Sequence, residues 1–322
     1  MIIGAKLGHF PDLPVISKQT ECARGFKIVG FLNWAHTVNA KPDSVYRPVN
    51  FSDLPQKTGG RYYSGQKWSE WAGIPIETQI DTANKLGASG WFQIPHTMTD
   101  EAIEQFVETV IDGCDHRPVF EFSNEVWNSQ FMQYHELAAN GSIAGADLEP
   151  LKAALLVLSS ETIKLRSIVQ DRGDVVLCGQ LANVWILEFM LQNSEVSNYI
   201  DAIAVAVYYQ SSEQIDGILR RNLEVHKELA DKHGNELWVY EFGSDIRGTR
   251  VVDINRSWAA YGDYDKLITI MKNTGVKRAL AYSTVSKYIQ TAEYGRAFGL
   301  YESSSGDAVE MPKMAAIRKH ME

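Results

Sequence analysis

Along most of the chain, short apolar runs alternate with longer segments whose apolar residues recur every three or four positions. The short runs are rich in β-branched and aromatic residues and are bounded by polar or glycine residues, which is typical of buried strands. They lie at residues 2–7, 27–34, 89–96, 118–123, 174–181, 202–209, 236–243 and 278–285. The segments with helical periodicity lie at residues 76–86, 100–113, 151–171, 215–232, 264–273 and from about 312, and a further short helix is expected to end near residue 24.

This alternation of strands and helices predicts a parallel sheet. Eight such units within the 322 residues predict a (β/α)8 barrel, the TIM barrel, which we expect to form a single domain over residues 1–322. A doubly wound open sheet is the alternative. A catalytic site on such a sheet would need a phosphate-binding glycine turn or a nucleophile elbow, and the motifs GxGxxG, GxxxxGK[ST] and GxSxG are absent.

Composition and charge narrow the classes of partner. The net charge is −9 and Lys and Arg do not cluster, which argues against nucleic acid. The sequence has no apolar run of 18 residues, so we expect no membrane span, and its first residues do not form a signal peptide. Its wide spacing of Cys22, Cys114 and Cys178 is neither a disulfide framework nor a metal motif, so no metal or other cofactor is expected.

Polar and aromatic residues follow the carboxyl ends of the predicted strands, where barrel enzymes carry their catalytic groups. They are Asn33 and Trp34, His96, Asn124 and Glu125, Tyr208 and Tyr209, Glu241, and Tyr282 and Ser283. Glu125 ends the run PVFEFSNE and Glu241 lies near the end of ELWVYEFG. Two carboxylates on one rim suit cleavage of a glycosidic bond, in which one group protonates the leaving oxygen and the other attacks or activates water.

At these residues the sequence resembles the clan A glycoside hydrolases, and most closely the cellulase-like catalytic modules of large bacterial surface or secreted proteins. The matching stretches are GIPIETQIDTANKLGASGWFQIPH at 73–96 and EFSNEVWN at 121–128, with WVYEFG at 238–243 as a weaker third. Members of this clan carry the acid/base and the nucleophile at the ends of the fourth and seventh barrel strands, which is where the strand count puts Glu125 and Glu241.

The resemblance implies a role for each matching residue. Glu125 would be the general acid/base and Glu241 the nucleophile, while Asn124 would hold the sugar 2-hydroxyl. His96 and either Tyr208 or Tyr209 would orient the carboxylates, and the tyrosine would bond to the nucleophile.

The sequence departs from the clan at two strand ends. Asn33 and Trp34 stand where many members carry an arginine, and Tyr282 stands where many carry a tryptophan. All three are kept as candidate substrate-binding residues, and the further candidates for stacking on sugar are Trp68, Trp71 and Trp185. Glu121 alternates with Ser123 and Glu125 and is interpreted as a buried structural carboxylate.

The long irregular stretch at 39–73 combines prolines with many aromatic residues. It is either a loop packed on the outer wall of the barrel or a wall of the substrate cleft.

These observations predict a retaining glycoside hydrolase that cleaves a β-linked oligo- or polysaccharide with two glutamates. One alternative is a barrel that binds glycan without cleaving it, as part of an adhesin or a tail structure. An inverting hydrolase is another, since the stereochemistry depends on the distance between the two carboxylates. We expect the chain to act on extracellular glycan, and it could be a module of a longer protein.

Overall fold

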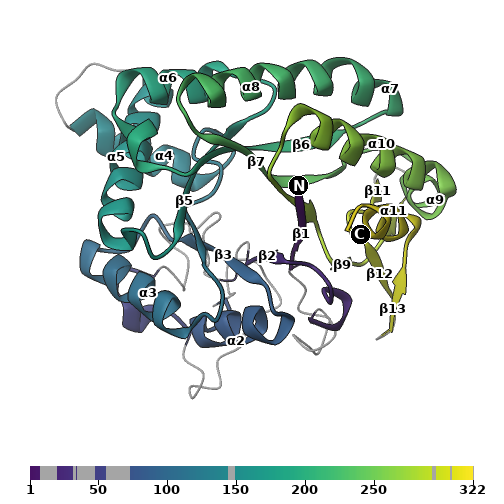
Figure 1. The fold of residues 1–322 in the computed structure, drawn as a ribbon, viewed down its shortest axis with the longest axis horizontal. Coiled ribbons are helices and arrows are strands. Elements are labelled where there is room, and N and C mark those ends of the chain that lie inside the picture. The colour runs from purple at the N-terminus through teal and green to yellow at the C-terminus, as the bar shows by residue number, and fades with distance from the viewer. Residues whose placement is uncertain are drawn as a thin grey trace.

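The computed structural model describes residues 1–7, 20–31, 34, 48–55, 73–143, 149–291, 295–304 and 307–321. Within these ranges, eight parallel strands form a closed barrel in chain order (Figure 1). They are β1 (Ile2–Lys6), β2 (Ile28–Gly30), β3 (Ser89–Ile94), β4 (Val119–Phe122), β5 (Asp174–Gln180), β6 (Ala202–Tyr209), β7 (Glu236–Ser244) and β8 (Arg278–Tyr282). The first and last strands pair from Ile2 opposite Arg278 to Lys6 opposite Tyr282, which closes the sheet. The predicted (β/α)8 barrel is therefore confirmed.

Helices surround the barrel and cover its outer face (Figure 1). They are α2 (Ile76–Leu86), α3 (Asp100–Gly113), α4 (Met132–Ile143), α5 (Pro150–Val169), α6 (Trp185–Asn193), α7 (Ser212–Gln214), α8 (Arg220–Lys232), α9 (Val251–Arg256), α10 (Trp258–Thr274) and α11 (Pro312–Met321). Short helical turns lie at η1 (Phe51–Asp53), η3 (Val196–Tyr199) and η4 (Ile215–Leu219).

The ends of these helices follow from local chemistry. The Thr99 hydroxyl accepts a hydrogen bond from the Ala102 amide and begins α3, and Asp100 and Glu101 in the first turn favour the positive end of the helix dipole. Helix α2 ends at Gly87, whose φ of 60° lies in the left-handed region that glycine adopts without strain.

Several elements differ from the sequence expectation. Helices α4, α6 and α9 are absent from the segments predicted to be helical. Strand β2 is confined to Ile28–Gly30, shorter than the predicted 27–34. After β8 the chain forms small strands, β9 (Val285–Ser286), β10 (Ile289–Gln290), β11 (Gly295–Arg296), β12 (Tyr301–Ser304) and β13 (Asp307–Glu310). Strands of two to four residues carry too little alternation to be recognised in a sequence.

The core has two layers, because successive residues of a strand point to opposite faces of the sheet. The outer layer packs the strands against the helices and contains residues such as Phe92, Phe120 and Val239. The inner layer fills the barrel and centres on Trp91 and Trp238, whose rings lie 5.7 Å apart edge to face.

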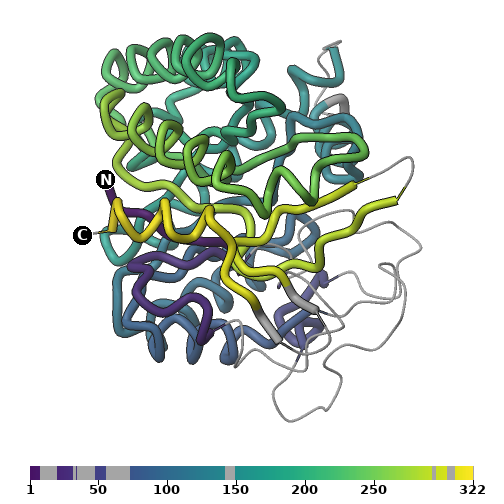
Figure 2. Tube along the Cα trace, turned by 90° about the vertical axis from the view of Figure 1, so that its right-hand side faces the viewer, coloured from purple at the N-terminus to yellow at the C-terminus, as the bar shows by residue number. Residues whose placement is uncertain are grey.

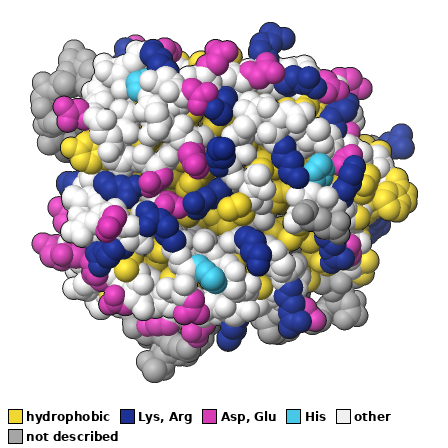
Figure 3. All heavy atoms as spheres, viewed as in Figure 1, with side chains coloured by type: hydrophobic (Ala, Val, Ile, Leu, Met, Phe, Trp, Pro, Cys, Tyr) yellow, Lys and Arg dark blue, Asp and Glu magenta, His cyan; other side chains and the backbone are white. Residues whose placement is uncertain are grey.

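The two ends of the described chain lie at the same end of the barrel, on the left of Figure 2. Figures 1 and 3 view the barrel from this end, opposite the rim where the strands have their carboxyl ends. On the face seen in Figure 3, Lys and Arg side chains are interspersed with Asp and Glu and do not form one basic field. None of the described helices is long and apolar enough to cross a bilayer.

Candidate active site

Glu125 and Glu241 lie at the carboxyl-terminal rim of the barrel, on the fourth and seventh strands. Strand β4 ends at Phe122, three residues before Glu125, and Glu241 lies near the carboxyl end of β7. Tyr240 links the two, because its hydroxyl donates a hydrogen bond of 3.1 Å to Glu125 Oε1. The predicted strand count is therefore correct, and both carboxylates belong to one site.

A bulge in β7 turns Glu241 into the barrel. Val205 of β6 pairs with Val239, but the next residue, Ala206, pairs with Glu241, so Tyr240 is an extra residue in the register. Strict alternation from the inward-facing Trp238 would put Tyr240 inside and Glu241 outside. The extra residue re-aims the strand, which is a known use of bulges beside active sites, and both side chains face inward.

Two donors hold the Glu241 carboxylate. The Lys6 ammonium group lies 2.9 Å from Oε1, and the Tyr208 hydroxyl donates a hydrogen bond of 2.6 Å to Oε2. Glu241 is only 7% exposed and Lys6 only 1%. Burial disfavours the charge on Lys6, but the carboxylates of Glu241 and Glu121 outweigh it and raise the pKa of Lys6. The Glu241 carboxylate therefore has a positive charge on one oxygen and a phenol donor on the other.

Glu125 occupies a different environment. Burial and then the charge of Glu241 raise its pKa to about 7, although hydrogen bonds from Asn128 and Tyr240 oppose the shift. The Asn128 amide donates to Glu125 Oε2 at 3.0 Å. No Lys or Arg among the described residues forms an ion pair with Glu125, whose protonated form is therefore favoured up to about neutral pH.

The backbone around Glu125 is strained. Ser123 and Glu125 have φ angles of 61° and 44°, in a region that costs a side-chain-bearing residue about 1–3 kcal/mol. Such strain persists where neighbouring contacts fix the conformation. One of them is the Gln133 side chain of α4, which donates to the Asn124 carbonyl at 2.7 Å.

A buried amide network orients Asn124, which is 4% exposed. The Gln93 side-chain amide donates both to Asn124 Oδ1 at 2.9 Å and to Glu121 Oε2 at 3.0 Å. Trp91 also donates to Glu121, at 2.8 Å, so Glu121 is the buried, partnered carboxylate that the sequence predicts. Because Asn124 Oδ1 is already bonded, its Nδ2 group is the part left to meet a substrate.

Comparison with known proteins identifies the architecture. No protein-family model and no curated protein matches the sequence, whereas solved structures do. A GH51 arabinofuranosidase from Xanthomonas axonopodis pv. citri superposes with a TM-score of 0.60 at 12% identity, over 99% of this chain and 69% of its own. A glucosidase from Croceicoccus marinus gives 0.60 at 14% identity, over 98% and 66%. A GH39 β-xylosidase from Caulobacter crescentus gives 0.57 at 12%, over 98% and 70%.

These glycoside hydrolase structures share the (β/α)8 barrel fold with this chain. At these identities the likeness concerns the fold alone, and the predicted structural resemblance is confirmed at that level.

The structure shows which of the two candidate tyrosines bonds to Glu241, a choice that the sequence did not decide. Tyr208 faces the barrel and bonds to Glu241, whereas Tyr209 points outward and packs against Tyr264 of α10, with 6.2 Å between ring centroids. A sequence signal exists in retrospect. In β6, small residues at Ala202 and Ala204 face the barrel interior and alternate with larger residues that face outward. Tyr208 occupies a later position with the same alternation, so it also faces inward.

Tyr282 lies beside this group and forms part of an aromatic wall. Its ring lies 6.4 Å from that of Tyr208 and 5.5 Å from that of Phe298, in the segment after β11. Phe298 also lies 6.4 Å from Tyr208, so the three rings contact one another beside Glu241.

The remaining candidates either contact side chains other than the two glutamates or lie outside the described residues. His96 Nε2 lies 2.9 Å from Glu136 of α4, and neither proposed catalytic glutamate is its recorded partner. Trp34 is 1% exposed and packs against Phe31. Trp185 lies on α6 against Phe189. Asn33, Trp68, Trp71 and most of the stretch 39–73 lie outside the described residues.

Sequence reasoning missed Lys6, Gln93, Asn128 and Tyr240. Lys6 alone carried a visible signal, since a lysine inside the apolar run IIGAKLG must find a buried partner.

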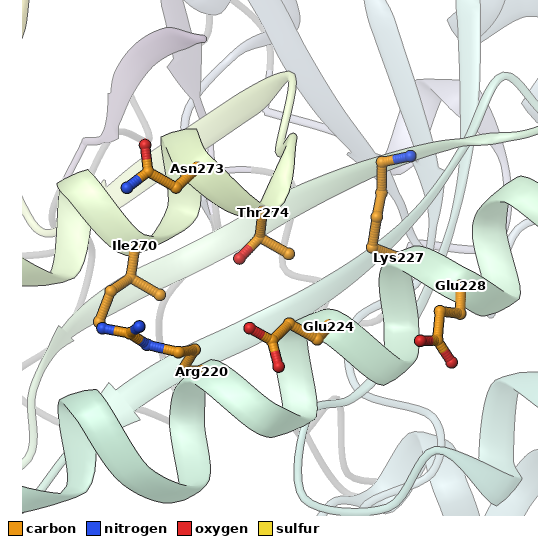
Figure 4. A pocket seen from close by; sticks show the side chains of 7 residues that line it. All are labelled: Arg220, Glu224, Lys227, Glu228, Ile270, Asn273 and Thr274. Atoms are coloured by element: carbon orange, nitrogen blue, oxygen red, sulfur yellow. The ribbon is translucent and has the colours of Figure 1, made fainter.

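Two surface hollows lie outside this site, between helices of the outer ring. One, of about 320 Å³, lies between α8 and α10 (Figure 4). The other, of about 280 Å³, lies between α3 and α5. Both are lined largely by charged and polar side chains of mixed sign and include neither Glu125 nor Glu241. Among the described residues, no group of three or more His, Cys, Asp or Glu side chains is arranged to hold a metal ion.

Proposed function

We propose that this chain is a retaining glycoside hydrolase acting on a β-linked oligo- or polysaccharide. The observation that carries the proposal is the contrast between two neighbouring glutamates. One is held by an ammonium group and a phenol, and the other has a pKa raised to about 7. Two carboxylates kept in opposite protonation states at one pH are what glycoside hydrolysis requires.

In the first step, the Glu241 carboxylate attacks the anomeric carbon of the sugar. The bond from that carbon to the glycosidic oxygen breaks, and the oxygen leaves with the proton of Glu125. The products are a glycosyl ester on Glu241, a released alcohol and an ionised Glu125. Tyr208 bonds to Glu241 Oε2 and so fixes the orientation of the attacking group.

In the second step, water attacks the same carbon and gives its proton to Glu125. The ester bond breaks and returns Glu241 to its carboxylate form, so both residues are restored and the anomeric configuration is retained. Asn124 Nδ2 would donate to the sugar 2-hydroxyl, since Gln93 already binds the amide oxygen.

The proposal does not specify which sugar is cleaved, because the structural neighbours have different activities. They include an arabinofuranosidase, a glucosidase, a β-xylosidase, an endo-β-1,4-mannanase and a xylanase. The wall formed by Tyr208, Tyr282 and Phe298 would supply the flat apolar faces on which sugar rings pack.

The test is reducing-end release from a panel of β-glucans, β-mannans, xylans and bacterial surface polysaccharides. Wild type, Glu125→Gln and Glu241→Gln are compared, with Glu108→Gln on the outer helix α3 as the control. We expect release by wild type and control, and loss of about 10³-fold or more in both site variants. The anomer formed first, observed by NMR, distinguishes retention from inversion.

If the wild type binds a glycan but produces no new reducing ends from any glycan, the result would support the non-catalytic barrel. Release that survives both site substitutions would assign the chemistry to other residues.

A further inference from the structure

Lys6 is the last residue of β1 and lies inside the barrel. Its ammonium nitrogen is 2.9 Å from Glu241 Oε1 and 5.1 Å from the centroid of the Tyr240 ring. Its carbonyl oxygen accepts hydrogen bonds from the Thr284 amide at 2.9 Å and the Thr284 hydroxyl at 2.8 Å. The backbone and the charged end of this residue are therefore both fixed.

The neighbouring strand leaves room for the lysine stem. Lys6 pairs in register with Gly30 of β2. A Cβ atom on Gly30 would lie only 3.0 Å from Lys6 Cγ and 2.8 Å from Leu280 Cδ2, closer than such atoms normally approach. The absence of a side chain at Gly30 thus allows the lysine to run along the barrel interior to Glu241.

The charge of Lys6 is directed mainly at one carboxylate. A lysine that is 1% exposed requires compensation for its lost hydration. Glu241 supplies a direct bond, and Glu121 acts on Lys6 through space. Among the described residues, Lys6 is the one cation in ion-pair contact with Glu241.

We infer that Lys6 is a positioning residue that holds the Glu241 carboxylate in its orientation and in its charged form. This inference rests on the proposed function, in which Glu241 is the attacking group.

Removing the cation should make Glu241 harder to ionise, since its other neighbours are neutral or acidic. The titratable groups that interact with it are Lys6 of β1, Glu125 after β4, Cys178 of β5, Tyr208 of β6, Tyr240 of β7 and Tyr282 of β8. Further out, Glu121 of β4 acts on Lys6, and Arg296 of β11 acts on Tyr282. Glu125 lies close enough to Glu241 for their negative charges to repel each other. Loss of the ammonium group therefore removes the positive charge that contacts the Glu241 carboxylate, and the acid limb of the pH profile is expected to move to higher pH.

The experiment measures kcat/KM against pH for wild type, Lys6→Met, Lys6→Gln and Lys6→Arg. We expect the two neutral variants to lose about 10²-fold at the optimum and their acid limb to rise by about one to three pH units. Lys6→Arg keeps the charge, so its acid limb should stay near that of the wild type whatever its rate. A structural role alone would lower the rate or the stability without moving this limb.

Lys313→Met is the matched control. Lys313 is 0% exposed, and its ammonium group bonds to the Ala297 and Phe298 carbonyls at 2.8 and 3.2 Å, not to a site carboxylate. This variant replaces an equally buried lysine and should leave the acid limb in place.

The outcomes separate the two proposals. An active wild type whose Lys6→Gln variant keeps the acid limb would overturn the role of Lys6 and leave the hydrolase intact. The same limb shift in Lys313→Met would also overturn it, because the shift would then follow from any buried lysine. A wild type without turnover on any glycan would instead contradict the proposed function itself.

Discussion

The surroundings of Glu241 and of Glu125 differ although both side chains belong to one site. Glu241 receives an ammonium group from β1 and a phenol from β6. Glu125 receives an amide from Asn128, three residues later in its own loop, and a phenol from Tyr240. One carboxylate is held by side chains from two other barrel strands, and the other lies on a strained turn.

The difference shows how one residue type can take two roles. An ammonium group in direct contact stabilises the charged form of a buried carboxylate far more than an amide does. Glu241 holds such a contact, and burial together with its charge raises the pKa of Glu125 to about 7. The ionised state of one glutamate thus helps to keep the proton on the other.

The largest expected effect comes from comparing two substrates, one whose leaving group needs a proton and one whose leaving group does not. This comparison tests which glutamate is the acid and which is the nucleophile. With a dinitrophenyl glycoside of the preferred sugar, the leaving oxygen needs no proton, so Glu125→Gln should keep a near-normal first step. The same variant should lose about 10³-fold on the polysaccharide. Glu241→Gln should lose about 10⁴-fold or more on both substrates, since the attacking group is gone. Stopped-flow release of dinitrophenolate measures the first step.

Equal losses by Glu125→Gln on both substrates would contradict its role as the acid. A full burst from Glu241→Gln would contradict covalent attack by that residue.

Much of the barrel could be predicted from the sequence, because its strands are buried on both faces and bounded by polar residues. The run AIAVAVYY at 202–209 became β6 over the same residues. The positions of Glu125 and Glu241 on the fourth and seventh strands also followed from counting such runs. The helices that were missed, such as α9 with six residues, are too short to show a clear period.

The contacts of the site could not be predicted in the same way. In WVYEFG, alternation places Trp238 and Tyr240 on one face and Glu241 on the other, and only the pairing with β6 and β8 reveals the bulge. Lys6 lies 235 positions from Glu241 in sequence, so their contact depends on closure of the barrel. Sequence reasoning can place a residue on a rim, but partners from non-neighbouring strands require the three-dimensional register.

A second prediction concerns stability, where the two glutamates should also differ. The folded-state pKa of Glu125 lies above its ordinary value of 4.5, so the folded protein binds the extra proton between these values. Stability should therefore fall as pH rises from about 4.5 to 7 and then level off. Glu125→Gln removes this penalty and should be more stable than wild type at pH 8, by up to about 3 kcal/mol.

Urea unfolding at pH 5 and pH 8 measures the effect. The free energy of unfolding of Glu125→Gln should exceed that of the wild type by a small amount at pH 5 and by a larger amount at pH 8. Glu188→Gln on α6 serves as the control for loss of one partly exposed carboxylate. A gain that is the same at both pH values would mean that the titration of Glu125 does not limit stability.

The smallest effect comes from the amide that bonds to Glu125. The Asn128 hydrogen bond favours the charged form of Glu125 and lowers its pKa, so Asn128→Ala should raise it. Because the acid must be protonated, the basic limb of kcat/KM, near pH 7 in the wild type, should move upward by about half a unit. The acid limb should stay in place, since Asn128 does not contact Glu241. Asn193→Ala on α6, whose amide donates to the Phe189 carbonyl of the same helix, should move neither limb. A downward shift of the basic limb in Asn128→Ala would mean that the amide stabilises the protonated acid. The donor to Glu125 would then favour the protonated carboxyl group, unlike the donors to Glu241, and the two environments would differ more than their hydrogen bonds indicate.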